Sequence, residues 1–118
     1  MKKVMIVDDS SFLRLSLKKI LESSGFEVIA EAADGLEALE KYNTYKPDII
    51  SMDITMPKLN GIDAIKELKA IDKNVKIIVV SSLGHEDQVR KAILAGAANF
   101  VVKPFKEEFI KEAFNKVT

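Results

Sequence analysis

The chain has 118 residues, of which 47% are apolar and 31% charged, a composition typical of one globular domain with a buried core. Eighteen basic residues balance eighteen acidic ones, so the charge indicates no general affinity for nucleic acid or for an anionic membrane surface. Cysteine is absent and histidine occurs once, which excludes disulfide frameworks, thiol catalysis and the usual structural zinc sites. Any metal would therefore have to bind oxygen ligands.

The N-terminal segment does not resemble an export signal. After Met1-Lys2-Lys3 the apolar run covers only residues 4–7 before Asp8-Asp9 interrupts it. No stretch approaches the length of a membrane span. We therefore expect a cytoplasmic protein.

Five short runs rich in Val and Ile predict β-strands. The run Ile77-Ile78-Val79-Val80 is continuously apolar, which favours strands covered on both faces, as in a parallel sheet. The predicted strands cover residues 3–7, 27–32, 48–52, 76–80 and 99–102.

Each predicted strand is followed by a segment whose apolar residues recur at helical spacing. Strand and helix thus alternate five times, which predicts a single doubly wound α/β domain whose ligand site lies beyond the carboxyl ends of the strands. The apolar positions are Leu13, Leu17, Ile20 and Leu21; Leu36, Leu39 and Tyr42; Ile65, Leu68 and Ile71; Val89, Ala92 and Ile93; and Phe109, Ile110, Ala113, Phe114 and Val117.

Polar residues follow four of the predicted strands: Asp8-Asp9, Asp53, Ser81-Ser82 and Lys103-Pro104. If the first and third strands are neighbours, three carboxylates converge, and two such charges at about 4 Å repel by roughly 4 kcal/mol at an effective dielectric near 20. A hard divalent cation offsets this repulsion, and Mg²⁺ suits a site with one or two direct carboxylates plus water.

The same residues could receive a phosphoryl group. It would meet the metal, the Lys103 ammonium, the Ser81 hydroxyl and backbone amides at helix N-termini. Asp53 is the candidate nucleophile, because an aspartate can form an acyl phosphate, and Asp8 and Asp9 would share the metal. Taken alone, Asp9 or Asp53 could be a helix cap, Lys103 a solvated lysine and Ser81 a turn residue. Their combination favours the site.

Four stretches, VMIVDDSSFLR, PDIISMDITMPKLNGIDAI, KIIVVSS and AGAANFVVKPF, resemble response-regulator receiver domains. The likeness covers essentially all of residues 1–118 and is strongest to chemotaxis regulators. It implies a (βα)5 flavodoxin-like fold with a five-stranded parallel sheet in the order 2-1-3-4-5. It also implies a two-component phosphoacceptor switch rather than an enzyme with its own substrate, although such a switch promotes its own phosphorylation and slow dephosphorylation.

The resemblance assigns a role to each site residue. Asp53 is implied to accept the phosphoryl group from a kinase phosphohistidine. Asp9 and Asp53, with the backbone carbonyl of Thr55, are implied to bind Mg²⁺ directly, and Asp8 to act through water. Lys103 is implied to pair with the phosphoryl group. The resemblance also implies a cis peptide bond between Lys103 and Pro104.

The resemblance further implies that Ser81 and Phe100 are switch residues. Phosphorylation would draw the Ser81 hydroxyl inward and let the Phe100 ring rotate, changing the face made by the fourth helix, fifth strand and fifth helix. Many chemotaxis regulators have tyrosine in place of Phe100, so one hydrogen bond to a partner is lost here. Thr55 is implied to influence dephosphorylation.

Phe12 and Leu15 lie off the apolar stripe of the first helix and should be exposed near the mouth of the acidic site. We hypothesise that they dock the helices of the kinase. His85 opens the fourth helical segment and is expected to be a solvated residue without a catalytic role.

The expected partners are a sensor or chemotaxis histidine kinase, an output protein such as a flagellar motor switch component, and a phosphatase. We expect a monomer that binds neither nucleic acid nor membrane. A phosphorelay intermediate of the sporulation type and a receiver domain cut from a longer regulator are alternatives. An aspartate-nucleophile phosphatase is disfavoured because Asp53-Ile54-Thr55 lacks its second aspartate. A flavodoxin-like cofactor binder is disfavoured because no Ser/Thr/Gly-rich phosphate loop follows the first strand, and Asp8-Asp9 at that position would repel a phosphate in the absence of a metal.

Overall fold

The computed structural model describes residues 2–54, 60–82 and 84–118, in which five strands alternate with five helices. The strands are β1 (Lys3–Val7), β2 (Glu27–Ala32), β3 (Ile49–Asp53), β4 (Lys76–Ser82) and β5 (Asn99–Lys103). The helices are α1 (Ser11–Ser23), α2 (Gly35–Tyr45), α3 (Gly61–Ile71), α4 (Glu86–Ala95) and α5 (Glu107–Asn115).

Three strands run further than the sequence predicts. β3 continues into Asp53, β4 into Ser82 and β5 into Lys103. The reason is that the backbone ladder continues regardless of side-chain polarity, with Asp53 paired to Val80 and Ser82 to Lys103. The predicted site residues of these strands are therefore held by the sheet itself, a more rigid support than a loop.

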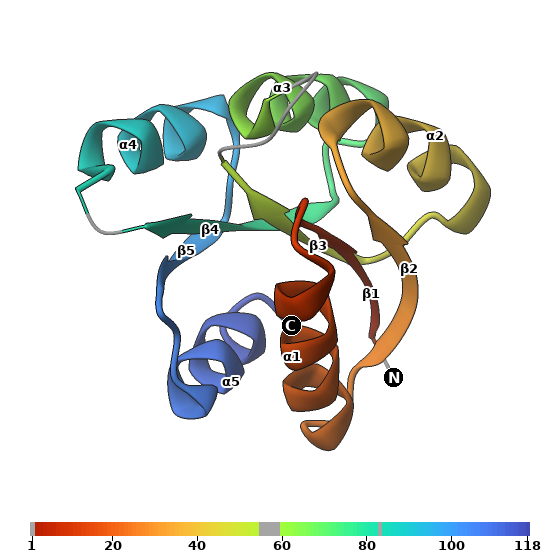
Figure 1. Ribbon diagram of the computed structural model, residues 1–118. Coiled ribbons are helices and arrows are strands. Elements are labelled where there is room, and N and C mark those ends of the chain that lie inside the picture. Colours follow the sequence, from red (N-terminus) through yellow and green to blue (C-terminus); the bar gives the residue numbers. More distant parts are fainter. Residues whose placement is uncertain (1, 55–59, 83) are drawn as a thin grey trace.

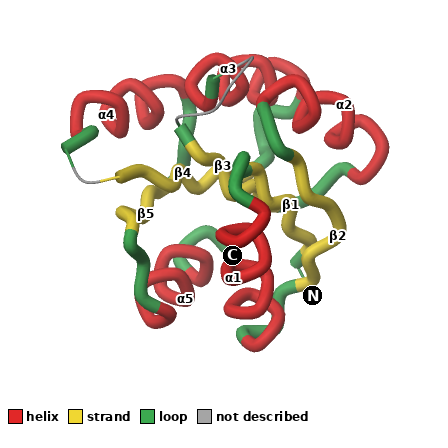
Figure 2. The backbone as a smooth tube through the Cα atoms, in the orientation of Figure 1, coloured by secondary structure: helices red, strands yellow, loops and turns green. Residues whose placement is uncertain are grey.

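The strands form one sheet in the order β2-β1-β3-β4-β5, and all four pairings are parallel. The predicted doubly wound fold and its strand order are confirmed. Helices α2, α3 and α4 cover one face of this sheet, while α1 and α5 cover the other (Figures 1 and 2).

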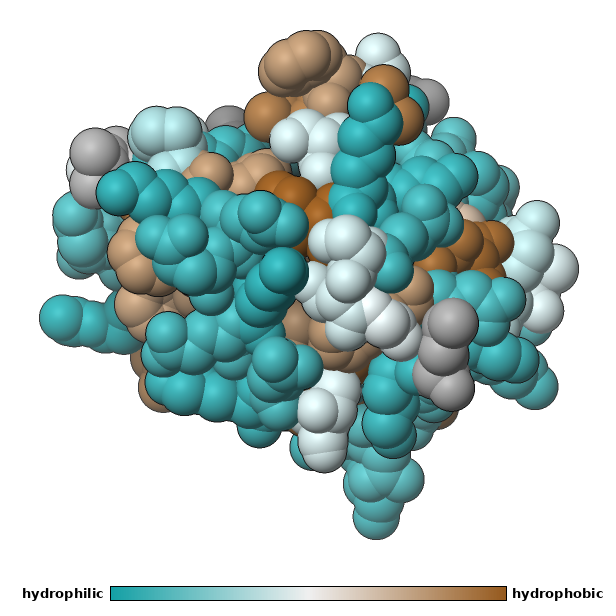
Figure 3. All heavy atoms as spheres, turned by 90° about the horizontal axis from the view of Figure 1, so that it is seen from below, coloured by the Kyte–Doolittle hydropathy of each residue, from teal (hydrophilic) through white to brown (hydrophobic). Residues whose placement is uncertain are grey.

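Each face of the sheet carries its own hydrophobic core. Successive side chains of a strand point to opposite faces, so in β1 Met5 and Val7 pack under α2–α4 while Val4 and Ile6 pack against α1 and α5. The face that carries α1 and α5 is mainly hydrophilic on its outside, with smaller hydrophobic areas among the polar side chains (Figure 3). Both helices therefore bury one side and expose the other.

Some apolar residues at helical spacing do not reach a core. Leu36, Ile71, Ile93 and Phe109 were expected on buried stripes, yet they are 48%, 50%, 41% and 54% exposed. Leu36 and Ile71 lie at the ends of α2 and α3. Ile93 and Phe109 belong to the two helices that flank β5, the edge strand of the sheet, where no further strand or helix of the described residues follows. Spacing predicts a helix face but not whether a neighbour covers it.

Tyr42 joins α2 to the end of α3. Its hydroxyl donates a 2.6 Å hydrogen bond to Asp72 Oδ2. Burial, this hydrogen bond and the nearby carboxylates raise the pKa of Tyr42 to about 12, and the same hydrogen bond lowers the pKa of Asp72. The phenol is therefore neutral at physiological pH.

Candidate functional site

Three carboxylates converge at the carboxyl edge of the sheet. Asp8 and Asp9 follow β1 and Asp53 ends β3, and these two strands are adjacent in the sheet. One oxygen from each of the three carboxylates lies within 4.8 Å of the others. Asp8 and Asp53 are only 6% and 5% exposed, whereas Asp9 faces solvent. The predicted convergence is thus present in the structure.

Helix capping does not account for these aspartates. The N-cap of α1 is Ser10, whose side chain accepts from the Leu13 amide, and the N-cap of α3 is Asn60. Asp8 accepts a hydrogen bond from the Ser10 amide through Oδ1 at 2.9 Å. The simpler interpretation of Asp9 and Asp53 as caps is therefore wrong.

Lys103 reaches the acidic cluster from the far edge of the sheet. Its Nζ lies 3.2 Å from Asp8 Oδ2 and 3.5 Å from Asp53 Oδ2, and its side chain is 19% exposed. Among the described residues, one ammonium lies opposite three carboxylates, so their charges leave a negative excess in a partly buried site. The cis peptide bond between Lys103 and Pro104, implied by the resemblance, is present.

The donor set fits magnesium. Carboxylate oxygens are the hard ligands that Mg²⁺ prefers, and the exposure of Asp9 leaves access for the water ligands that Mg²⁺ usually keeps. The excess negative charge would also be neutralised by a divalent cation. The Thr55 carbonyl, predicted as a further ligand, lies outside the described residues.

Ser81 and Phe100 line a common cavity. Ser81 is 3% exposed and donates through Oγ to the Ser82 carbonyl at 3.1 Å, while Phe100 on β5 is 46% exposed. A cavity of about 270 Å³ lies between them, with Val89 and Val102 among its apolar walls. This space is large enough to accept a phenyl ring.

His85 departs from the expectation of a solvated loop residue. It is the N-cap of α4, is only partly exposed, and lines the same cavity as Ser81 and Phe100. Its side chain makes no capping hydrogen bond. Its position in the sequence could not indicate that it lines this cavity.

Gly61 fixes the approach of α3 to the site. A Cβ at this position would lie 2.4 Å from the Asp53 carbonyl oxygen and 2.7 Å from Ile54 Cα. The Gly61 amide donates to the Ile54 carbonyl at 3.0 Å, so the contact is between two backbones. Only glycine fits without displacing the end of β3.

We expect Gly61→Ala to lower stability by about 1–3 kcal/mol, because the methyl group overlaps with backbone that cannot relax locally. Chemical denaturation measures this change. Gly84→Ala is the contrasting variant, since a Cβ at Gly84 meets nothing within 4 Å although its φ is +89°. If Gly61→Ala kept wild-type stability and phosphorylation, the close approach of Gly61 to the backbone of Asp53 and Ile54 would not be required for either property.

Phe12 and Leu15 are 76% and 51% exposed on α1, which confirms the predicted exposure. α1 begins directly after the acidic loop, so both side chains lie near the mouth of the site. Their predicted role in docking a kinase is not tested by these positions.

Sequence reasoning missed Arg14, which donates to the backbone carbonyl of Asp8 and pairs with Glu31. Its position in the helix carries no signal of this contact, because a long side chain reaches partners that are distant in the sequence.

A known family model matches nearly the whole chain. The response regulator receiver domain model matches residues 4–115. The chain belongs to this family.

Relatives of this receiver domain include chemotaxis proteins. It is 56% identical to the chemotaxis protein CheY of Thermotoga maritima, over 99% of this chain and 98% of the relative. It is 49% identical to the chemotaxis protein CheY of Bacillus subtilis, over 97% and 95% of the two chains. Among solved structures, the CheX–CheY–BeF3–Mg complex from Borrelia burgdorferi matches with a TM-score of 0.93 and 40% identity, over 98% of this chain and 88% of the other. The chain is a CheY-like receiver domain.

None of the helices in the described part of this receiver domain is long and apolar enough to span a membrane.

Proposed function

We propose that the receiver domain accepts a phosphoryl group on Asp53 from the phosphohistidine of a histidine kinase in a chemotaxis pathway. The observation that carries this proposal is the position of Asp53 between two aspartates and Lys103. An Asp53 carboxylate oxygen attacks phosphorus, the phosphorus–nitrogen bond of the donor breaks, and the imidazole leaves. The product is an aspartyl phosphate on this chain.

Asp8, Asp9 and Asp53 would hold Mg²⁺, with the Thr55 carbonyl as a proposed further ligand outside the described residues. When bound, the metal would neutralise charge on the phosphoryl oxygens. Lys103 contributes a second positive charge beside Asp53 and orients the transferred group. The strands hold these residues in place before the donor arrives, so little reorganisation is needed.

Ser81 and Phe100 would carry the signal outward. On phosphorylation the Ser81 hydroxyl gives up its bond to the Ser82 carbonyl and donates to the phosphoryl group. The Phe100 ring then moves from solvent into the cavity beside Ser81. Burying this ring removes apolar surface from water, so the inward state is favoured once space is available.

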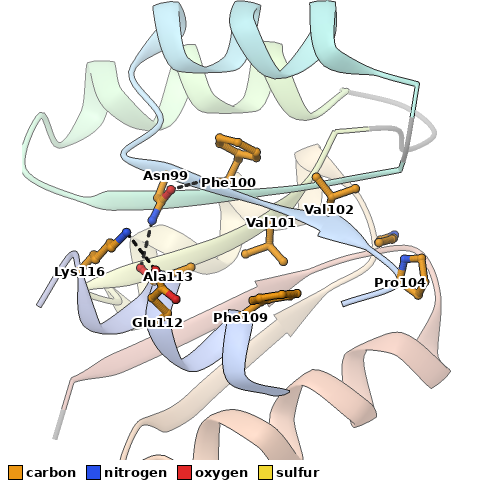
Figure 4. A pocket seen from close by; sticks show the side chains of 10 residues that line it. Asn99, Phe100, Val101, Val102, Pro104, Phe109, Glu112, Ala113 and Lys116 are labelled. Atoms are coloured by element: carbon orange, nitrogen blue, oxygen red, sulfur yellow. Dashed lines mark hydrogen bonds and ion pairs between the residues drawn. The ribbon is translucent and has the colours of Figure 1, made fainter. Parts of the chain in front are cut away.

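The output surface is proposed to be the α4-β5-α5 face. A groove of about 620 Å³ follows the edge of β5, and its lining includes Phe100, Phe109 and Val102 (Figure 4). Leu94 on α4 is 81% exposed. A change at Phe100 alters this surface directly, which suits a switch that is read by a protein partner such as a flagellar motor switch component.

Residues 1–118 act as one response regulatory domain, as a monomer, in the cytoplasm, without binding nucleic acid or membrane. The solved relative from Borrelia burgdorferi is in complex with CheX, and we propose that a comparable partner acts as the phosphatase of this chain. Slow self-dephosphorylation resets the switch without it.

A phosphorelay intermediate would use the same site residues. Incubation of the phosphorylated protein with motor switch and phosphorelay proteins, followed by pull-down, separates the two roles. Binding to the motor switch component that depends on phosphorylation supports the chemotaxis proposal. Transfer of the phosphoryl group to a histidine phosphotransfer protein, without motor binding, contradicts it.

Leu15→Ala should slow phosphotransfer from the cognate kinase about tenfold, because truncating an interface side chain that contributes to binding costs more than about 1 kcal/mol. Phosphorylation by a small phosphodonor should be unchanged, since that donor has no helices to dock. Ile71→Ala is the matched control, because Ile71 is 50% exposed at the far end of α3 from the site. Equal kinase rates for Leu15→Ala and wild type would remove α1 from the docking surface.

A further inference from the structure

Arg14 connects two strand ends at the acidic site. Its side chain is 18% exposed, although arginine is usually solvated. Nη1 donates to the backbone carbonyl of Asp8, and Nε donates to Glu31 Oε1 at 3.0 Å. The fork of the guanidinium therefore spans from the end of β1 to β2.

The hydrogen bond from Arg14 Nη1 is accepted by the peptide group that joins Asp8 to Asp9, the two aspartates of the proposed metal site. Asp8 is held at its amide, which donates to the Ala32 carbonyl at 3.0 Å, and at its carboxylate by the Ser10 amide and Lys103. Its carbonyl accepts from Arg14. Because a peptide unit is planar, fixing this carbonyl fixes the amide of Asp9 and the direction in which Asp9 leaves the strand.

Glu31, the partner of Arg14, is held in position by contacts with α2. Lys41 donates to the Glu31 backbone carbonyl and pairs with Glu37 at 3.4 Å. Glu37 in turn accepts from the Ala33 amide at 3.0 Å. Glu31 thus orients the guanidinium from a strand end that α2 holds in position.

We propose that Arg14 is a positioning residue for magnesium, which holds the Asp8–Asp9 peptide so that the Asp9 carboxylate faces the cation. This inference rests on the proposed magnesium-dependent function. The side-chain contacts of Arg14 are with the Asp8 carbonyl and Glu31, so its effect on a metal would pass through Asp8 and Asp9. It acts as an outer partner, and loss of such partners commonly weakens metal binding about 10–100-fold.

The direction in which the Mg²⁺ affinity changes when Arg14 is replaced distinguishes a positioning role from a purely electrostatic effect. Arg14 is a cation near an acidic site, so removing its charge should by Coulomb's law tighten the binding of Mg²⁺. Loss of positioning should weaken it. We expect Arg14→Met to raise the Kd for Mg²⁺ about tenfold, measured by calorimetric titration of the unphosphorylated protein without any phosphodonor.

Three further measurements complete the test. Arg14→Lys keeps the charge but loses the fork, so its affinity should also fall, by less than in Arg14→Met. This variant decides the matter alone if Arg14→Met does not fold. Lys19→Met removes an exposed charge from the same helix and should leave the affinity unchanged or slightly higher. Amide hydrogen exchange at Asp8 should be faster in both Arg14 variants before Mg²⁺ is added.

Wild-type affinity, or tighter binding, in both Arg14 variants would overturn the inference while leaving the proposed function intact. A wild-type protein that binds no Mg²⁺ and forms no phosphoryl adduct would overturn both. Weaker binding in the Arg14 variants with unchanged binding in Lys19→Met supports the positioning role.

Discussion

Asp53→Asn should form no phosphoryl adduct when incubated with a small phosphodonor and Mg²⁺. The amide nitrogen and oxygen are poor nucleophiles, and the change also removes one of the three clustered carboxylates. We expect the rate to fall on the order of 10⁴-fold or more, the scale seen when a catalytic nucleophile is removed. Intact-protein mass spectrometry over a time course measures the loss.

Two controls accompany this experiment. Asn has nearly the shape of Asp and relieves repulsion within the cluster, so thermal unfolding without Mg²⁺ should occur no lower than in the wild type. Asp63→Asn removes a carboxylate from the exposed first turn of α3 and should accept phosphate at the wild-type rate. A normal adduct on Asp53→Asn would mean that another residue is the acceptor.

Lys103→Met should have the second largest effect. It should strengthen Mg²⁺ binding but slow phosphorylation. The Nζ cation lies 3.2 Å from Asp8 Oδ2 and 3.5 Å from Asp53 Oδ2, so it would compete with a metal for these two carboxylates. Its removal should therefore tighten Mg²⁺ binding. The rate of phosphorylation should nevertheless fall about 10²–10³-fold, because a preorganised charge beside the phosphoryl group is lost.

Lys106→Met provides the matched control for this variant. Lys106 is an exposed lysine three residues along the chain, before α5, and its side chain makes no capping hydrogen bond. It should change neither metal affinity nor phosphorylation measurably. If Lys103→Met bound Mg²⁺ more weakly than the wild type, the ammonium would be supporting the metal rather than competing with it.

Much of the fold follows from local pattern. Apolar runs such as residues 77–80 predict strands, and helical spacing between them predicts crossovers, so the parallel sheet can be predicted before any contact is known. Strand ends could not be placed in the same way. Asp53 and Lys103 interrupt the apolar runs, yet their backbones continue the ladder.

The site could be predicted in outline, because parallel strands bring their carboxyl ends to one edge. The meeting of Asp53 with Lys103 follows from that topology, whereas the roles of both residues stay predictions. Arg14 could not be predicted, since its two partners are reached across space by a flexible side chain. The exposure of Phe109 depends on β5 being an edge strand, which spacing within one helix does not reveal.

The acceptor residue can be identified directly by borohydride reduction, which converts an aspartyl phosphate into homoserine. The protein is treated with a small phosphodonor and Mg²⁺, reduced, digested and sequenced by tandem mass spectrometry. We expect homoserine at position 53 alone, and none when Mg²⁺ is removed with a chelator. Homoserine at position 8 or 9, or labelling at position 53 that is independent of the metal, would contradict the account.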